Sequence, residues 1–457
     1  MDTLDRSAAP QRIVDIDSLD QEGRGVGHWQ GKTIFVEGAL PGERVEFSPY
    51  RRKPAYELAR ASKLLRGSAQ RVTAACPHYG VCGGCSLQHM DVRAQVAAKQ
   101  RTLEDALWHI GRVRPSHMLP ALYGPAWAYR QRARLTVRNV PKKGGVLVGF
   151  HERRSSYVAD MTDCPVLPRH IGCLLPLLRE LVSSLSLRER LPQIEVACAD
   201  NVDVLVLRIL QPLTHADEDR IRRFGDEHGV AIYLQPAGPE SARPFHPMPM
   251  PEPEYRLPEF GLALTFGPTE FTQVNAAMNR ALVSRAVRLL APAAGEKIAD
   301  LFCGLGNFSL PIAKSGACVV GLEGSSTLVE RAAHNAQRNG LSERCRFVRS
   351  DLFKDAAAAL AREGPFQRIL IDPPRDGAIE VVKALPQPLP SRIVYVACNP
   401  ATLARDAGVL VSMQGYELTA AGVVNMFPHT AHVESMAVFD RPAEARPVGD
   451  RRTEARR

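Results

Sequence analysis

The chain has 457 residues, more than one hydrophobic core of roughly 250 to 300 residues normally serves, so we expect two or three domains. Its 58 Lys and Arg against 49 Asp and Glu leave a formal charge of +9, which favours an anionic partner without deciding between nucleic acid, a membrane surface and none. The first ten residues carry acids where a secretion signal carries bases, and no apolar run of about 18 residues occurs, so we predict a cytoplasmic protein without a membrane span. Ten cysteines are too sparse for a disulfide scaffold and indicate metal binding or chemistry where they cluster.

The first segment, from about Arg12 to Leu65, shows short apolar alternations broken by glycines, a pattern typical of a small β-barrel. A basic run follows on what we predict to be its last strand and exit, with Glu57 as its one acid. The positive residues are Arg51, Arg52, Lys53, Arg60, Lys63, Arg66 and Arg71. Because a barrel carries them, we interpret them as contacts to an RNA backbone, with a solvated face as the alternative.

The segment from Val92 to Ile110 is rich in Ala, Gln and Leu and predicts a helix. A strand with an unusual face follows at 129–138. Its four arginines, Arg130, Arg132, Arg134 and Arg138, share one parity and so point to one side of the strand. Like charges in a row repel one another, which favours a polyanionic partner. The alternative is an edge strand that charges protect from aggregation.

The second half of the chain changes character. Seven prolines between Pro236 and Pro253 predict a linker or surface loop without a packed element. From about Phe266 strands and helices alternate, which predicts a doubly wound α/β sheet. The tail from Arg441 to Arg457 has no apolar periodicity, and we expect it to be disordered.

A glycine-containing turn, Asp300 to Phe308, joins the first predicted strand of this region to its first helix. Its D-x-x-x-G-x-G spacing differs from the G-x-G-x-x-G of dinucleotide folds and offers no pyrophosphate cradle, so S-adenosylmethionine is a better ligand for it than a dinucleotide. A purely structural turn is the alternative. Glu323 ends the next predicted strand, where a carboxylate can accept hydrogen bonds from ribose. Asp351 follows the third strand, at a position suited to the adenine.

Two more strand ends carry reactive groups. Asp372 precedes Pro373-Pro374-Arg375; since enzymes that methylate exocyclic amines tend to have an aromatic ring after the prolines, Arg375 argues against N-methylation. Cys398 ends the next strand before Asn399-Pro400, and we expect the helix N-terminus there to lower its pKa. A thiolate adding to carbon 6 of uracil makes carbon 5 nucleophilic enough to take a methyl group. Inert packing is the alternative role for this cysteine.

Such a reaction needs a base to remove the proton from carbon 5. We choose Glu434, because it enters the apolar strand 435–439, where partial burial would raise its pKa to a useful value. His429 and His432 are competitors, and a structural ion pair is the other role open to Glu434.

These motifs, together with Phe271 to Asn275 and His432 to Ser435, resemble those of the bacterial RNA (uracil-C5)-methyltransferases. The resemblance covers about Arg12 to Asp440 and is strongest to the branch that acts on 23S rRNA and carries a TRAM barrel and an iron-sulfur cluster. It implies Cys398 as nucleophile and Glu434 as base. It also implies cofactor or target-base contacts by Gln273, Phe302, Asn307, Glu323 and Asp372; the family varies at Asp351.

Cys76, Cys82 and Cys85, with Cys164 far along the chain, also resemble the iron-sulfur ligands of this branch. Spacing alone leaves a tetrathiolate zinc site as a close rival, because both need four thiolates. The resemblance implies a [4Fe-4S] cluster with a structural or RNA-positioning role. Cys173 and Cys198 match nothing in the pattern, and we expect both to be packing residues.

The expected architecture is therefore an OB-like β-barrel (TRAM), a central α+β domain with the cluster, and a Rossmann-like S-adenosylmethionine-dependent methyltransferase domain. We assign residues 1–70 to the barrel, 71–92 with 125–262 to the central domain, 93–124 with 263–442 to the methyltransferase domain, and 443–457 to a disordered tail. We expect a monomer that methylates 23S rRNA. The same chemistry on tRNA or another rRNA uridine, and a non-catalytic RNA-binding assembly factor, are the alternatives.

Overall fold

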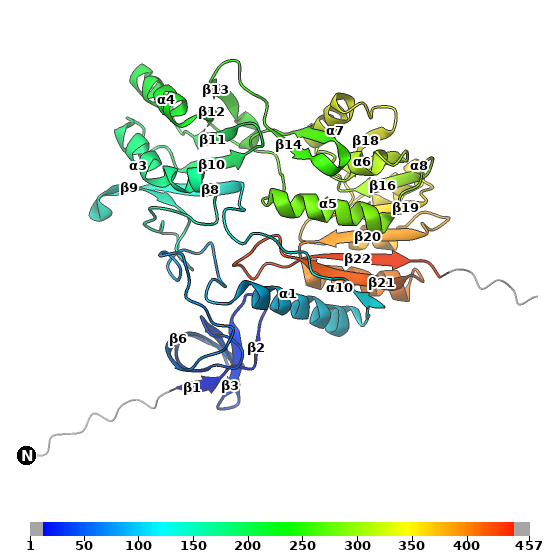
Figure 1. The fold of residues 1–457 in the computed structure, drawn as a ribbon, viewed down its shortest axis with the longest axis horizontal. Helices are drawn as coiled ribbons and strands as arrows, with labels where there is room; N and C mark the ends of the chain where they lie inside the picture. The colour runs from blue at the N-terminus through cyan, green and yellow to red at the C-terminus, as the bar shows by residue number, and fades with distance from the viewer. Residues whose placement is uncertain (1–11, 443–457) are drawn as a thin grey trace, which may run out of the picture.

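A computed structural model describes residues 12–442 of the chain, so the tail predicted for 443–457 lies outside the described residues. Figure 1 shows three parts: a small blue barrel, a green central sheet, and a large sheet that runs from yellow to red. Among the residues described, no helix is both long and apolar enough to cross a membrane. The multidomain architecture predicted from the sequence is confirmed.

The barrel is a six-stranded sheet in the order β1-β5-β6-β4-β3-β2. The sheet curls because β1 lies directly over Gly27 of β3, where an added Cβ would meet the Asp15 carbonyl oxygen at 2.3 Å. Val14, Ile34, Val36, Val45 and Phe47 fill its core. Its strands are β1 (Ile13–Asp15), β2 (Ser18–Leu19), β3 (Gly25–Trp29), β4 (Lys32–Glu37), β5 (Arg44–Arg52) and β6 (Tyr56–Arg66).

A buried ion pair anchors the exit of the barrel. The Glu43 side chain is fully buried, and its two oxygens accept from Arg71 Nε at 2.6 Å and Arg71 Nη2 at 2.7 Å. The same carboxylate accepts from the backbone N–H of Leu40 and Ser68. Arg71, which we had grouped with the basic run, is therefore committed to the fold, whereas Arg51, Arg52 and the other members are exposed.

We expect Arg71→Ala to lower the free energy of unfolding of the barrel by roughly 3 kcal/mol, because it leaves the Glu43 charge buried without its partner. Urea unfolding followed by tryptophan fluorescence measures this, since Trp29 packs on Phe47 with ring centroids 5.8 Å apart. Arg60→Ala, at an exposed position of β6, is the control and should change the unfolding free energy by less than about 0.5 kcal/mol. Equal effects of the two substitutions would show that the pair does not anchor the barrel.

The central sheet has the order β13-β12-β11-β10-β8-β9. The arginine strand, β8, lies between β9 and β10, so the edge-strand alternative is wrong. Ala133, Leu135 and Val137, which alternate with the arginines along the strand, are buried in the core. The elements of this part are α2 (Arg169–Gly172), α3 (Leu174–Ser184), α4 (His215–His228), β8 (Arg132–Val140), β9 (Gly145–Gly149), β10 (Gln193–Cys198), β11 (Asp203–Arg208), β12 (Val230–Gln235), β13 (Arg243–His246), and the 3-10 helices η2 (Pro141–Lys143) and η3 (Pro239–Ser241).

Strand β13 lies inside the proline-rich stretch, so our prediction that this stretch has no packed element is wrong. The strand pairs with β12 at one edge of the sheet and buries Phe245. Proline has no backbone N–H to donate to a neighbouring strand. An edge strand has a neighbour on one side only and therefore tolerates a proline such as Pro244.

The large sheet has the order β18-β17-β16-β19-β20-β22-β21-β7, with β16 to β20 parallel. Strand β16 lies between β17 and β19. The chain passes from β16 to β17 and β18 on one side and then returns to β19 on the other, and this reversal makes a switch point at the carboxyl ends of β16 and β19. The elements are β7 (His117–Met118), β16 (Lys297–Leu301), β17 (Cys318–Glu323), β18 (Cys345–Arg349), β19 (Arg368–Ile371), β20 (Arg392–Ala397), β21 (Glu417–Val424) and β22 (Glu434–Asp440).

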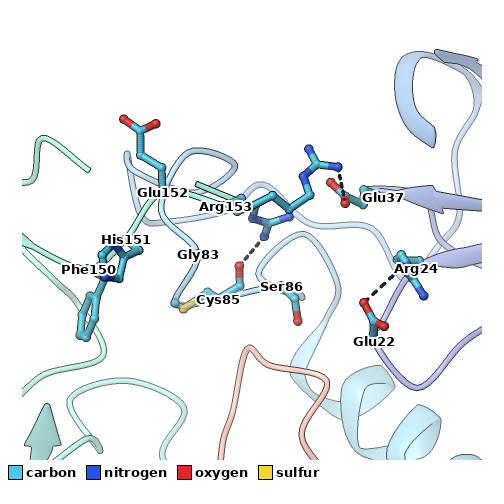
Figure 2. Close-up of a pocket in the computed structure, with 12 residues that line it drawn as sticks. Glu22, Arg24, Glu37, Gly83, Cys85, Ser86, Phe150, His151, Glu152 and Arg153 are labelled. Carbon is cyan, nitrogen blue, oxygen red and sulfur yellow. Dashed lines mark hydrogen bonds and ion pairs between the residues drawn. The ribbon is translucent and has the colours of Figure 1, made fainter. Parts of the chain in front are cut away.

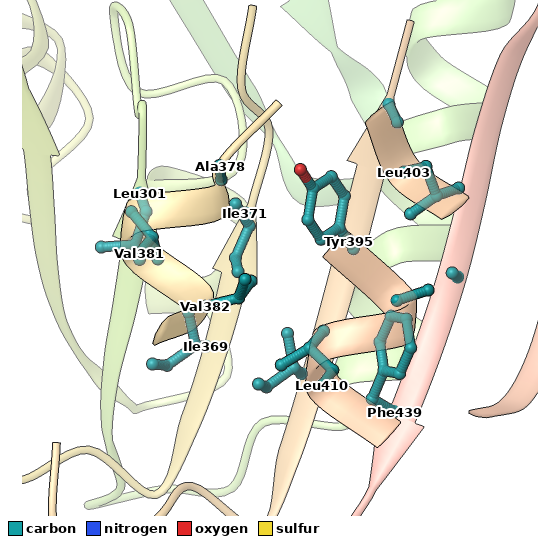
Figure 3. Packing of buried hydrophobic residues seen from close by; sticks show 14 of the residues in the cluster. Leu301, Ile369, Ile371, Ala378, Val381, Val382, Tyr395, Leu403, Leu410 and Phe439 are labelled. Atoms are coloured by element: carbon teal, nitrogen blue, oxygen red, sulfur yellow. The ribbon is translucent and has the colours of Figure 1, made fainter. Parts of the chain in front are cut away.

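Helices cover both faces of this sheet. On one face α1, α8, α9 and α10 pack a core that includes Leu103, Leu360, Val382 and Leu410, and Figure 3 shows α9 and α10 against β19 and β20. On the other face α5, α6 and α7 pack with the hairpin β14-β15. The bounds are α1 (Val92–Ala106) continued by the π-helix η1 (Leu107–Gly111), β14 (Glu254–Leu257), η4 (Pro258–Phe260), β15 (Leu262–Thr265), α5 (Ala276–Leu290), α6 (Ser309–Ala313), α7 (Ser326–Arg338), α8 (Ala356–Glu363), α9 (Ile379–Lys383) and α10 (Pro400–Ser412).

Candidate active site

A cavity of about 540 Å³ opens at the switch point of the large sheet. Eight of its lining residues are the site residues predicted from the sequence, although they come from distant parts of the chain. They are Gln273, Phe302, Asn307, Glu323, Asp351, Asp372, Cys398 and Glu434. The size of the cavity is in the range that small-molecule ligands occupy in proteins.

The turn after β16 forms one wall of the cavity. Phe302, Gly304 and Gly306 all have positive φ, of 63°, 54° and 95°. Glycine adopts this conformation without cost, whereas Phe302 stores strain that the surrounding fold must hold. The Gly304 N–H donates to Glu323 Oε2 at 3.1 Å, and so ties the turn to the end of β17.

Two further predicted residues already have protein partners. The Asn307 side chain exchanges hydrogen bonds with Asn279 at 3.0 Å and accepts from the Tyr255 hydroxyl at 2.8 Å. Asp351 pairs with Lys354 at 3.1 Å near the cavity mouth. The first network fixes the Asn307 side chain, whereas the Asp351 carboxylate is half-exposed.

Cys398 follows β20 and faces both this cavity and a neighbouring hollow that Arg375 and Ala431 line. The pKa of its thiol is raised to about 11; burial is the largest cause, the carboxyls of Glu434 and Asp372 add to the rise, and Arg375 opposes it. The net shift is therefore upward, and the lowered pKa that we predicted for this thiol is wrong. Loss of water and two nearby acids outweigh the helix end.

Glu434 begins β22 and is 3% exposed. Burial, with Asp372 as the second cause, raises its pKa to about 8, and burial raises the pKa of Asp372 to about 7. The expected upward shift of the Glu434 pKa is thus present. His432 also lines the cavity, but burial lowers its pKa to about 4, which makes it a weaker base than Glu434.

The competitor His429 does not line this cavity: its ring stacks on Trp127, with centroids 3.9 Å apart.

A second cavity, of about 150 Å³, brings together Cys76, Cys82, Cys85 and Cys164. Arg130 lines the same space, and Arg153 donates to the Cys82 carbonyl at 3.4 Å and to the Cys85 carbonyl, as Figure 2 shows for Cys85. Within residues 12–442, the only three metal-ligating side chains with ligand atoms within 4.8 Å of one another are His170, Cys198 and Asp203. No three of the four sulfurs therefore all lie within 4.8 Å of one another.

The two remaining cysteines of the central part differ from each other. Cys198 is buried, as expected of a packing residue, whereas Cys173 is exposed, so the packing role predicted for Cys173 is wrong.

Comparison with known proteins gives the family. A family profile described as tRNA (Uracil-5-)-methyltransferase matches residues 265–441, and the TRAM domain matches residues 12–46. A Nitrosospira multiformis protein named 23S rRNA (uracil(1939)-C(5))-methyltransferase RlmD is 61% identical, over 93% of this chain and 98% of that protein. The chain belongs to the RlmD family. A relative of the same name from Aromatoleum aromaticum is 60% identical over 94% of this chain and 99% of its own.

The RlmD-family fold also has a solved counterpart. The Pyrococcus abyssi tRNA (uracil-54, C5)-methyltransferase, solved with S-adenosyl-L-homocysteine, has a TM-score of 0.72 and 24% identity, and it covers 94% of this chain and 100% of that one. At this identity the likeness concerns the fold. It confirms that the large sheet and its helices have the fold of a methyltransferase domain.

Sequence reasoning missed parts of the RlmD-family site. Tyr255, which follows the proline-rich stretch, received no role from the sequence, yet its hydroxyl holds Asn307. Lys99 is buried on α1 and donates to Asn425 Oδ1 and to the Phe427 carbonyl, each at 2.8 Å. A lysine among Val96 and Leu103 on the apolar stripe of a helix was a signal that could have been noticed. Phe427, which lines the cavity, had no sequence signal of its own.

Proposed function

We propose that this chain transfers a methyl group from S-adenosylmethionine to carbon 5 of a uridine in 23S rRNA, at the place that the names of its relatives give as 1939. The observation that carries the proposal is the meeting of Cys398, Glu434 and the glycine turn in one cavity. A thiol, a buried carboxyl and a nucleotide-sized space are what this reaction requires.

The sulfur of Cys398 acts first. It adds to carbon 6 of the uracil, its proton is lost to solvent, and the π electrons of the C5=C6 bond move onto O4 as an enolate. Carbon 5 of this adduct then attacks an electrophilic methyl group, which S-adenosylmethionine supplies when bound. Glu434 takes the proton from carbon 5, and the returning electrons expel the Cys398 thiolate.

The methyl donor fits the wall formed by Phe302 to Asn307. Glu323, held by the N–H groups of Gly304 and Ser325, can accept from ribose hydroxyls. Gln273, Phe302, Asn307, Asp351 and Asp372 complete the contacts that we assign to the donor and the target base. A donor bound along this wall leaves the part of the cavity beside Cys398 and Glu434 for a flipped base.

The rate at which free methylated RNA forms should rise with pH between about 6 and 9, because the raised pKa values of Glu434, about 8, and Cys398, about 11, keep both groups protonated at lower pH. Both groups act in their deprotonated form, so the sign is a gain with pH. Single-turnover rates at saturating RNA and donor measure this, with donor affinity followed over the same range. A flat profile would contradict the assignment of these two groups.

The substrate is tested by incubating the protein with isolated 23S rRNA and with tRNA, followed by mass mapping of the product. We expect 5-methyluridine in 23S rRNA at the relatives' position. 5-Methyluridine found only on tRNA would show that tRNA is the substrate, and it would leave the proposed reaction unchanged. No product on any RNA, with the donor bound, would favour the assembly-factor alternative.

We also propose that the four cysteines hold a [4Fe-4S] cluster. A zinc ion with Zn–S bonds of about 2.3 Å draws all its sulfurs to about 3.8 Å from one another, whereas no three of these sulfurs all lie within 4.8 Å of one another, around a space of about 150 Å³. Arg130 in the wall and Arg153 on the adjoining carbonyls suit an anionic cluster. The wider spacing therefore favours a cluster over one ion.

Protein purified without oxygen should contain about four irons and four acid-labile sulfides per chain and should absorb visible light. Cys164→Ser should lower the iron content strongly, because it removes one of four ligands, whereas Cys173→Ser, at an exposed position, should leave it unchanged. One zinc per chain in place of iron would overturn the cluster proposal.

A further inference from the structure

The loop of residues 427–432, hereafter the 427–432 loop, connects β21 to β22 and determines the shape of the active cavity. Its two ends, Phe427 and His432, line that cavity, and Glu434 follows two residues later. The loop adopts a strained form at its centre, because His429 is not glycine and has φ of 65°. Contacts from outside the loop must hold that conformation.

The holding contacts come from the segment that carries three of the cysteines. Ser86 and Leu87, directly after Cys85, both donate their backbone N–H to the His429 carbonyl at 2.9 Å. The Ser86 hydroxyl accepts from the Ala431 N–H at 3.0 Å. In Figure 2 the faint red ribbon of the loop passes beside Ser86, below Cys85 and Arg153.

Gln95 on α1 joins the same two segments from the other side. Its side chain is fully buried. Its Nε2 donates to the carbonyls of Leu87 at 3.0 Å and Met90 at 2.8 Å, while its Oε1 accepts from the His429 N–H at 2.8 Å. The side-chain amide of Gln95 thus pairs with backbone groups of both the cysteine segment and the 427–432 loop. Removing it would leave these buried backbone groups without hydrogen-bond partners, which costs free energy.

The barrel also contacts the cysteine segment and the 427–432 loop. Gly23, in the turn between β2 and β3, lies so close to Leu87 and Ala431 that an added Cβ would meet their side chains at 2.9 Å and 3.2 Å. The cysteine segment, α1 and the barrel therefore all contact the 427–432 loop.

We propose that Ser86 and Gln95 are positioning residues, which transmit the placement of the cysteine segment to the 427–432 loop and so to Phe427, His432 and Glu434. The group bound by the cysteines then acts on methyl transfer through the conformation of this loop, without contact with the reacting atoms. The change in kcat expected from this inference rests on the proposed function, whereas the expected change in hydrogen exchange of the loop does not.

The test compares Ser86→Ala, Ser86→Thr and Gln95→Met with the parent, all as full-length protein with iron content verified. Hydrogen exchange, read by mass spectrometry over residues 425–434, reports on the loop itself. We expect faster exchange in Ser86→Ala and Gln95→Met, a fall in kcat of about five- to tenfold for Ser86→Ala, an unchanged KM for S-adenosylmethionine, and recovery in Ser86→Thr, which keeps the hydroxyl. Ser183→Ala, at an exposed position of α3 in the central part, is the matched control and should change neither readout.

Unchanged exchange over the loop in Ser86→Ala would overturn the proposal, as would faster exchange with an unchanged kcat. If Gln95→Met fails to fold, the pair Ser86→Ala and Ser86→Thr decides the matter alone. Should the parent fail to methylate any RNA, the proposed function is lost, while the exchange data still decide whether Ser86 and Gln95 hold the loop.

Discussion

Cys398→Ala should lower methyl transfer by at least about 10³-fold, because the other thiol that lines the cavity, Cys303, is buried with its pKa raised well above the ordinary thiol value and cannot replace Cys398 as the nucleophile. The expected loss is in kcat, since the donor lies along the wall formed by Phe302 to Asn307. Methylation of 23S rRNA under single-turnover conditions measures it, and equilibrium titration of the donor checks that the cavity remains intact.

Cys173→Ala is the matched control, because Cys173 is exposed on the central part, and it should keep the parent's rate. The raised pKa of Cys398, about 11, predicts that the free thiol reacts slowly with alkylating reagents at neutral pH. Methylation by Cys398→Ala at the parent's rate would exclude covalent catalysis by this sulfur.

Glu434→Gln should stop the reaction after methyl transfer and accumulate a covalent RNA–protein complex with ordinary RNA. The amide has the shape of the carboxyl but cannot take the proton from carbon 5, so the C–S bond to Cys398 cannot break. Turnover should fall by about 10² to 10⁴-fold, the range of a lost general base. A denaturing gel with labelled RNA detects the complex.

The control for this change is Glu417→Gln, at an exposed position of β21, which should turn over normally and leave no complex. Complex formation by Glu434→Gln but not by the double variant with Cys398→Ala would link the two residues in one reaction. Free methylated product at the parent's rate from Glu434→Gln would transfer the role of base to another group that lines the cavity, such as Asp372 or His432.

The large sheet could be predicted because its signals are local. Apolar strands at 297–301, 318–323 and 392–397 alternate with helices, and the parallel sheet places their carboxyl ends at one edge. The site residues follow those strand ends, so the gathering of Asp372, Cys398 and Glu323 around one cavity was accessible from the sequence. The roles of these residues, and the domain boundaries we assigned, stay predictions.

The electrostatics of the cavity could not be predicted in the same way. The sequence shows that a helix begins after Cys398, which favours a lowered pKa, but it does not show that Glu434 and Asp372 lose their water beside the thiol. The pKa of Cys398 depends on burial and on groups far away in the sequence, and these reverse the local effect.

The support of the 427–432 loop was hidden for a related reason. Gln95 and Ser86 are ordinary polar residues in the sequence, and their hydrogen bonds to His429 and Ala431 join segments more than three hundred residues apart. Strand β13 was not predicted because the seven prolines of its segment indicated a loop. Its burial of Phe245 depends on the neighbouring sheet and could not be seen in the sequence. Tertiary packing decides both features, and local patterns carry no signal of it.

The most direct measurement is peptide mapping of the complex that the parent protein forms with 23S rRNA containing 5-fluorouridine, in which fluorine replaces the hydrogen that the base must remove. Mass spectrometry after digestion with protease and nuclease should find a methylated fluorouridine nucleotide on the peptide that contains Cys398. A nucleotide attached to another residue, or 5-methyluridine formed on ordinary 23S rRNA with no trapped complex on the fluorinated RNA, would contradict the reaction derived from this cavity.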